Sequence, residues 1–241
     1  MRYQPALKIQ RIALREWLIL SVALIALLLL LQVSSLFKRA DFFLYDSLMQ
    51  WNSKAAREDI VIVAIDDYSL AELGRWPWPR QYHAQLLQRL QGLQTKAIGL
   101  DFLFTEAEAN PASNSPTGDE QLAQQIATNQ NVVLALAVEN AGKGLQPALP
   151  YAKFAQAAAD LGHIHLELDS DGVARSVFLF EGMNQQKWPH FALALAEIGG
   201  ANTSLLQNKL ATQRLPRDLR NLAPSPGTWR RDYQMYIPFH G

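Results

Sequence analysis

Hydrophobic residues form one long run near the N-terminus and several short runs over the rest of the chain. The segment 17–37 contains no charged residue, and its centre, 24–31, is mostly leucine. A helix of about 20 apolar residues spans the roughly 30 Å hydrocarbon core of a bilayer. The pattern therefore predicts that residues 17–37 form a transmembrane signal anchor.

Basic residues on the two sides of this run predict its orientation. Four precede it and two follow it, namely Arg2, Lys8, Arg11 and Arg15 and then Lys38 and Arg39. An excess of positive charge marks the cytoplasmic side. Residues 1–16 are expected in the cytoplasm and residues 38–241 in the periplasm, with the anchor in a bacterial inner membrane. A cleaved signal peptide is the alternative, but the long apolar run favours an anchor.

The apolar pattern after the anchor predicts a helix and then a β-α-β unit. Residues 38–52 repeat apolar positions at helical spacing. Ile60–Ile65 is a continuous β-branched run, typical of a strand buried on both faces. A helix is predicted to start at Pro79 and to end at Gly92, and Ala97–Leu100 is predicted as the next strand. Such a crossover implies parallel strands.

The remainder predicts a mixed arrangement of strands and helices. Strands are expected over 131–138, 163–168, 173–180 and 233–239. Helices are expected over 151–160 and in two segments that begin at the capping box of Thr117 and at Pro189. Residues 201–232 are expected to be irregular. Asp169–Gly172 is typical of a hairpin turn. The predicted fold class is α/β, with a mixed, largely parallel sheet flanked by helices and preceded by the membrane helix.

Composition narrows the possible functions. The chain has no cysteine, so disulfides and thiolate metal sites are excluded. After residue 39 it contains 16 basic and 21 acidic residues. An acidic surface argues against binding to nucleic acid, which needs positive charge. The partners expected are the membrane and a small periplasmic molecule.

Three carboxylates follow predicted strands. Asp66 and Asp67 come directly after the first strand, and Asp101 comes after the second. Ligand sites in open α/β sheets form beyond the carboxyl ends of strands. The three side chains are candidates for binding a divalent or organic cation. A structural role is favoured over binding, namely pairing with Arg80 or Arg175, capping of a helix, or fixing the Trp-Pro segment.

The segment Trp76-Pro-Trp-Pro-Arg80 presents two indoles on a stiff main chain, because each proline restricts the residue before it. Trp76, Trp78 and Arg80 can line a ligand pocket or can close one end of the sheet. Arg175 follows the turn Asp169–Gly172 on the next predicted strand. The two aspartates of the turn resemble half of a calcium loop, but the later ligands and the terminal Glu of an EF-hand are missing, so a structural turn is favoured.

No catalytic or cofactor site can be assembled from the sequence. It lacks a Gly-x-Ser-x-Gly motif, a phosphate-binding glycine loop and a nucleotide fingerprint. His163 and His165 are two residues apart on a predicted strand, but no third ligand is evident. No metal and no cofactor are therefore predicted.

Several motifs occur in a fixed order. They are Ile62-Val-Ala-Ile-Asp-Asp-Tyr-Ser-Leu70, Gly74-Arg-Trp-Pro-Trp-Pro-Arg80, Ile98-Gly-Leu-Asp-Phe-Leu-Phe104, Leu161-Gly-His-Ile164, Asp169-x-Asp-Gly-Val173-x-Arg175 and Pro189-His-Phe-Ala-Leu-Ala194. Together they resemble the CHASE2 sensor domain over residues 40–241. The resemblance implies a non-catalytic extracytoplasmic sensor of a bacterial receptor. It also implies that more of the domain, further membrane helices and a diguanylate cyclase, adenylate cyclase or kinase follow residue 241, so that this chain is C-terminally incomplete.

Two other functions remain open from the residues alone. One is a membrane-anchored periplasmic binding protein or hydrolase that uses Asp66, Asp67 and Asp101. The other is an interaction module that forms a homodimer through the membrane-proximal helix 38–52.

Overall fold

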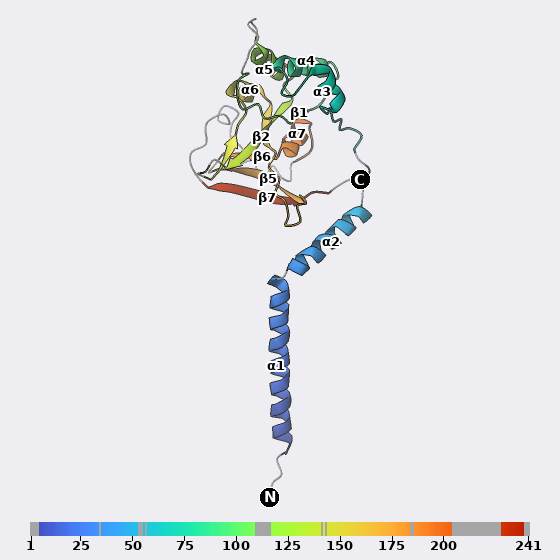
Figure 1. Cartoon of the computed structure of the whole chain (residues 1–241), viewed down its shortest axis with the longest axis vertical. Helices are drawn as coiled ribbons and strands as arrows, with labels where there is room; N and C mark the ends of the chain where they lie inside the picture. The colour runs from blue at the N-terminus through green and yellow to red at the C-terminus, as the bar shows by residue number, and fades with distance from the viewer. Residues whose placement is uncertain are drawn as a thin grey trace. The chain divides into compact units, whose positions relative to one another are not determined.

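The computed structural model describes residues 5–33, 35–52, 55, 57–108, 117–140, 142, 144–183, 186–203 and 228–238 (Figure 1). The chain divides into two compact units. One comprises residues 1–62 together with 238–241, and the other runs from Val63 to Ile237.

The N-terminal unit contains helices α1 (Pro5–Val33) and α2 (Ser35–Trp51). The helix predicted over 38–52 is therefore confirmed. Within the described part of the chain, none of the helices combines the length and the apolar character needed to cross a membrane. The membrane-spanning helix predicted over 17–37 stays a prediction.

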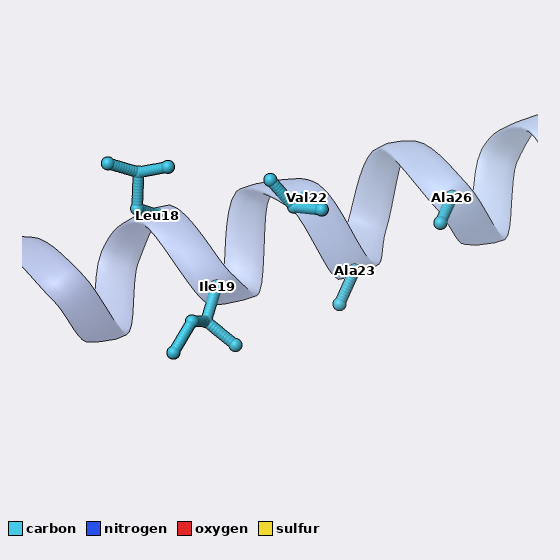
Figure 2. Close-up of a pocket in the computed structure, with 5 residues that line it drawn as sticks. All are labelled: Leu18, Ile19, Val22, Ala23 and Ala26. Carbon is cyan, nitrogen blue, oxygen red and sulfur yellow. The ribbon is translucent and has the colours of Figure 1, made fainter.

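A shallow pocket lies along α1 and is lined by that helix alone. Figure 2 shows its five side chains, which are Leu18, Ile19, Val22, Ala23 and Ala26. All five are hydrocarbon groups, so the pocket offers no polar group that could recognise a charged or hydrogen-bonding ligand.

The second unit contains the α/β domain. Its helices are α3 (Asp67–Leu73), α4 (Arg80–Gln91), α5 (Gly118–Asn129), α6 (Ala152–Ala157) and α7 (Phe191–Ile198). Its strands are β1 (Ile98–Leu100), β2 (Val132–Asn140), β3 (Leu145–Ala148), β4 (Asp160–His163), β5 (Ser176–Met183), β6 (Gln186–Pro189) and β7 (Trp229–Tyr236).

Strand β2 organises the first sheet. It pairs in parallel with β1 and with β4, and its far end pairs with β3 in the antiparallel sense. Successive side chains of a strand point to opposite faces. Val132, Leu134 and Leu136 join the main hydrophobic core, and the intervening Val133 and Ala135 are equally buried. The predicted strand 131–138 is confirmed, and burial on both faces explains its unbroken apolar run.

Helices pack against the first sheet in two groups. Leu87 of α4, Leu122 of α5 and Phe154 of α6 belong to the same core as β2. Helix α7 packs against β1, β2 and β4, and its Phe191 lies against Gly99 and Gly162, where a side chain would collide with it. A glycine on each of these two strands thus permits the close approach of α7.

The second sheet has the order β6-β5-β7 and is antiparallel throughout. The mixed α/β class is confirmed, but parallel pairing is confined to the first sheet. The two sheets meet at an isolated bridge between His163 and His190.

The predicted strand Ile60–Ile65 is not formed. Its residues lie in no ladder, and Ile60, Val61, Ile62 and Val63 are exposed. A strand needs a neighbour for its main-chain hydrogen bonds. Among the described strands, β1 pairs with β2 alone, so the apolar pattern indicated extended-strand propensity without indicating a partner.

Other boundaries differ from the sequence pattern. The helix expected over 151–160 is shorter, because α6 ends at Ala157 and β4 begins at Asp160. The strand expected over 163–168 ends at His163 instead, because only the residues up to His163 pair with β2. The strands expected over 173–180 and 233–239 are β5 and β7, displaced by a few residues, and residue 239 and most of 201–232 lie outside the described residues.

Helix ends were predicted well. Helix α4 starts after Pro79 and ends at Gly92, and α7 ends at Gly199. The capping box of α5 is complete, since Thr117 accepts from the Glu120 N–H and Glu120 accepts from the Thr117 N–H. The hydrogen bond from the Thr117 main chain lowers the pKa of Glu120.

Candidate functional site

The segment Trp76–Arg80, called here the Trp-Pro corner, connects α3 to α4. The Trp76–Pro77 peptide bond is cis. Trp78 Nε1 donates a hydrogen bond to the Gly74 carbonyl at 2.8 Å, which fixes the second indole. Trp76 is 42% exposed, so one large ring is available to solvent.

A series of aromatic rings in contact with one another connects the Trp-Pro corner with the main hydrophobic core. Ring centroids are 5.1 Å apart for Trp76 and Phe102, 5.5 Å for Trp76 and His83, 5.7 Å for Phe102 and Phe104, and 5.7 Å for Phe104 and Phe154. Offset and edge contacts at these distances are favourable. The exposed Trp76 is thereby continuous with rings that are completely buried.

Arg80, the first residue of α4, lies beside the buried end of this series. Its guanidinium is 4.4 Å from the Phe104 ring centre, and its Nε is 3.6 Å from Asp119 Oδ1. Both contacts stabilise the positive charge of Arg80 at a position that is largely shielded from water. Asp119 is in the first turn of α5, so Arg80 joins the starts of two helices.

Glu108 connects the start of α4 with the start of α5. Pro79 supplies no side-chain cap for α4, but Glu108 Oε1 accepts from the Arg80 N–H at 3.1 Å, and the Glu108 N–H donates to Asp119 Oδ2 at 2.9 Å. Gly118 leaves room for the carboxylate, because a Cβ there would lie 2.6 Å from Glu108 Oε2. A distant acid therefore caps α4.

Three buried polar atoms here have unused hydrogen-bonding capacity. They are Arg80 Nε, His83 Nε2 and Asp119 Oδ1, none of which has a hydrogen-bond partner among the described residues. Burial, and then the Arg80 cation, lowers the pKa of His83 to about 4, so its ring is neutral at pH 7. A buried donor or acceptor without a hydrogen bond is costly, and the ion pair between Arg80 Nε and Asp119 Oδ1 at 3.6 Å offsets part of this cost.

Among the described residues, Asp66, Asp67 and Asp101 do not belong to any group of three or more possible metal ligands. Asp66 caps α3, since it accepts from the Ser69 N–H at 2.8 Å and from the Ser69 Oγ at 2.6 Å. These bonds hold the pKa of Asp66 below its ordinary value. No hydrogen bond or ion pair joins Asp66, Asp67 and Asp101 in the described structure, and no group of three possible metal ligands occurs there. The helix-capping interpretation is confirmed for Asp66.

Arg175 belongs to a different part of the fold. It is 97% buried, and it donates to Asp169 at 3.0 Å and to both oxygens of Asp171 at 2.9 and 2.8 Å. The hydrogen bond from Arg175 lowers the pKa of Asp171. Asp169 and Val173 close the turn through the main chain, so the predicted structural turn is confirmed. The predicted hairpin is wrong, because β4 and β5 on the two sides of the turn belong to different sheets.

A comparison with models of protein families matches the CHASE2 domain over residues 21–241. The chain belongs to the CHASE2 family. CHASE2 domains are extracellular sensory domains. Comparisons with curated proteins and with solved structures gave no significant match.

Within this CHASE2 domain, the residues that surround Arg80 were only partly identifiable from the sequence. Trp76 and Trp78 contact each other with ring centroids 5.8 Å apart, and their role with Arg80 in a ligand pocket stays a prediction. Phe102 and Phe104 occur in the family motifs without an indicated role, and Asp119 is part of the capping sequence of α5. Glu108 gave no signal at all, because its partner Arg80 is 28 residues away.

Proposed function

We propose that this CHASE2 domain is the signal-input part of a bacterial membrane receptor whose output is a cytoplasmic cyclase or kinase. Three features support the proposal. The family is one of extracellular sensory domains, residues 17–37 carry no charge, and the portion after residue 39 is acidic. The apolar side chains of α1 between Leu14 and Leu30 are also exposed and need a non-aqueous environment.

The Trp-Pro corner carries the proposal that the signal is a small molecule. Trp76 offers an exposed aromatic face, and the neighbouring His83 has a buried Nε2 that makes no hydrogen bond with a described residue. An indole face binds planar rings by stacking and binds organic cations through its quadrupole. The side chains of the corner thus suit the binding of a planar or cationic molecule.

Ligand-dependent stabilisation of the full chain in detergent tests this role. Tetramethylammonium and planar heteroaromatic cations would be screened by thermal unfolding. A compound that binds the native state raises the melting temperature. Replacing Trp76 by Ala should abolish the rise, whereas Trp51→Ala should retain it, because Trp51 is 90% exposed on α2 and outside the corner.

The Trp76→Ala variant needs a control that separates loss of binding from loss of folding. Trp76→Phe keeps an aromatic face and should preserve part of the shift. An equal shift in wild type, Trp76→Ala and Trp51→Ala would exclude the corner as the binding site while leaving the receptor proposal intact.

Reporter fusions test the proposed topology. Alkaline phosphatase folds only after export, so a fusion after residue 52 should be active in bacterial cells and a fusion after residue 16 should be inactive. Activity after residue 16, or inactivity after residue 52 with normal expression, would contradict the proposed orientation.

We also propose that the receptor is a homodimer that pairs through α2. Leu44, Leu48 and Trp51 are exposed on this helix at spacings of four and three residues, the spacing of a helix-pairing seam. The chain has no native cysteine, so a single cysteine at each position can be oxidised selectively. Cross-linking should be efficient at positions 44 and 48 and weak at Gln50, and uniform cross-linking would count against a seam.

A further inference from the structure

Two histidines join the two sheets of the domain. His163 is the last residue of β4, and His190 precedes α7 directly after β6. Their main chains form an isolated parallel bridge, and their rings contact edge to face with centroids 5.1 Å apart at 87°. This pair is called here the His junction.

His163 is held in its neutral form. Its side chain has no exposed surface, and neither ring nitrogen makes a hydrogen bond of ordinary geometry with a described residue. Burial, followed by the charges that His190 and His165 would carry, lowers the pKa of His163 to about 3, and the main chain of Phe178 opposes this only weakly. Protonation of His163 is therefore unfavourable as long as the two rings of the His junction stay packed together.

His190 has a role that requires an unprotonated nitrogen. Its Nδ1 accepts a hydrogen bond from the Ala192 N–H at 3.3 Å and so caps α7. A proton on Nδ1 would turn this acceptor into a donor. It would also place a positive charge at a helix N-terminus, where the helix dipole is unfavourable for cations. Burial lowers the pKa of His190 accordingly.

The start of α7 is the most closely packed contact between that helix and the first sheet. A Cβ on Gly162 would lie 2.5 Å from Phe191 Cα, and one on Gly99 would lie 2.8 Å from the Phe191 ring. Release of the His190 cap would therefore change the packing on β1 and β4 together, because Phe191 touches both.

The surrounding charged groups do not neutralise a proton at the junction. His165 pairs with Glu181, which also accepts from Trp229 Nε1 and lies 3.8 Å from Arg231 Nε. Lys187 of β6 pairs with Asp232 of β7, and Glu197 of α7 accepts from Thr203. In the part of the chain described, no carboxylate forms an ion pair with His163 or His190.

We propose that the His junction is a proton-sensing site, at which mild acid releases the N-terminus of α7 from the first sheet before the domain unfolds. The ligand is the proton itself. This function is independent of ligand binding at the Trp-Pro corner, and it gives the sensory domain a second input, the acidity of the medium outside the cell.

Hydrogen–deuterium exchange of the full chain in detergent tests the proposal, at pH 7.5 and pH 5.5 with correction for the intrinsic exchange rate. If His163 titrates near 6.5 when the junction is open, the open population should rise about tenfold between these pH values. Exchange should increase by that factor in the peptides that cover 160–165 and 189–195, and these peptides should exchange faster than α5, whose exchange follows global unfolding. No increase in these peptides, or exchange no faster than that of α5, would overturn the proposal.

Substitutions at the two histidines test whether the acid response arises at the His junction. Asn is a good helix cap that does not titrate, so His190→Asn should retain slow exchange in α7 at pH 7.5 and should lose most of the acid response. His163→Phe keeps a ring of similar shape without a proton site and should also reduce it. His83→Gln is the control, because His83 lies on α4 outside the junction, and the junction peptides of this variant should respond to acid as those of the wild type do. An unchanged response in both His190→Asn and His163→Phe would overturn the proposal.

A measurement on the unmodified chain avoids any dependence on variant folding. The chain has five histidines, and nuclear magnetic resonance of histidine labelled at Cε1 can follow each one. Both junction rings should stay neutral at pH 6 and should change abruptly together at lower pH. Independent titration of either ring near pH 6.5, with α7 unaltered, would contradict the proposed site.

Discussion

A single buried guanidinium, that of Arg175, fixes the turn between Asp169 and Val173. Hydrogen bonds that involve charged groups contribute more than neutral ones. Arg175→Gln should lower the free energy of unfolding by about 2 kcal/mol, because the buried cation and its bidentate bonds to Asp171 are lost.

Urea unfolding of the full chain, followed by circular dichroism, measures this change. Arg57→Gln is the control, since the Arg57–Asp59 ion pair is exposed and such pairs contribute little. Equal effects of the two substitutions would show that Arg175 does not hold the turn.

His83 makes the stability of the domain depend on pH. Its folded pKa of about 4 lies below the ordinary value of 6.5. The unfolded chain therefore binds the proton first, and stability that is present above pH 6.5 is lost as the pH falls towards 4. The loss at pH 5 relative to pH 8 should be about 2 kcal/mol.

The same unfolding experiment at several pH values checks this dependence. In His83→Gln the part of the pH dependence due to this residue should disappear, whereas His165→Gln should keep it. A slope that is identical in His83→Gln and wild type would refute the assignment.

Individual residues could be predicted from the sequence where the chemistry is local. Capping was one of the interpretations for Asp66, and the turn at Asp169–Gly172 was predicted, because the residues that form each feature lie within a few positions of one another. Arg175 was expected as a partner for Asp66, Asp67 or Asp101, but it pairs with Asp169 and Asp171. The contacts of Arg80 with Glu108 and Asp119 join segments that are distant in sequence, and no pattern of residue types indicates them.

At the scale of elements, the contact of α7 with β4 gives a sharp prediction. Gly162→Ala would bring a methyl group to 2.5 Å from Phe191 Cα. Because a main-chain atom cannot move aside easily, the substitution should cost about 3 kcal/mol of stability, the upper range for overpacking.

Gly92→Ala is the matched control for Gly162→Ala. Its Cβ would meet only the Arg89 carbonyl, at an ordinary 3.7 Å, and Gly92 ends α4 with helical dihedral angles. This change should be neutral or slightly stabilising. A Gly162→Ala chain as stable as Gly92→Ala would show that α7 does not pack closely on β4.

Elements with strong periodicity and end signals were predictable, and those that depend on a partner were not. Helices α4, α5 and α7 have apolar faces and clear ends, so their positions followed from the sequence. The runs 60–65 and 131–138 look alike in apolar content, yet only the second forms a strand, because β1 and β4 lie on either side of it. Sequence reports the propensity of a strand but not the neighbour that completes it.

At the scale of the whole molecule, the α/β class and the alternation of elements were predictable, whereas the division into two sheets was not. Both sheets are made of short strands with similar composition. The separation arises because β5 pairs with β6 and β7 and not with β2, and this choice depends on long-range contacts.

The exposure of the Ile62 side chain allows a mutational test of whether residues 60–65 form the strand that their apolar pattern predicts. Because its side chain is 86% exposed, Ile62→Lys should change the stability of the folded unit by less than about 0.5 kcal/mol. Ile98→Lys, at a position only 7% exposed in β1, should cost several kcal/mol, since it buries a charge. Strong destabilisation by Ile62→Lys would show that the segment 60–65 pairs as a strand after all.

The exposed run from Ile60 to Val63 also bears on how the chain stays in solution. Short uncharged segments rich in β-branched residues promote aggregation when they are accessible. Acidic residues lie directly on both sides of this one, with Glu58 and Asp59 before it and Asp66 and Asp67 after it. Charges in such positions act as gatekeepers, because stacking of copies would bring like charges together. Two of the aspartates that first suggested a binding site thus also protect the protein from self-assembly.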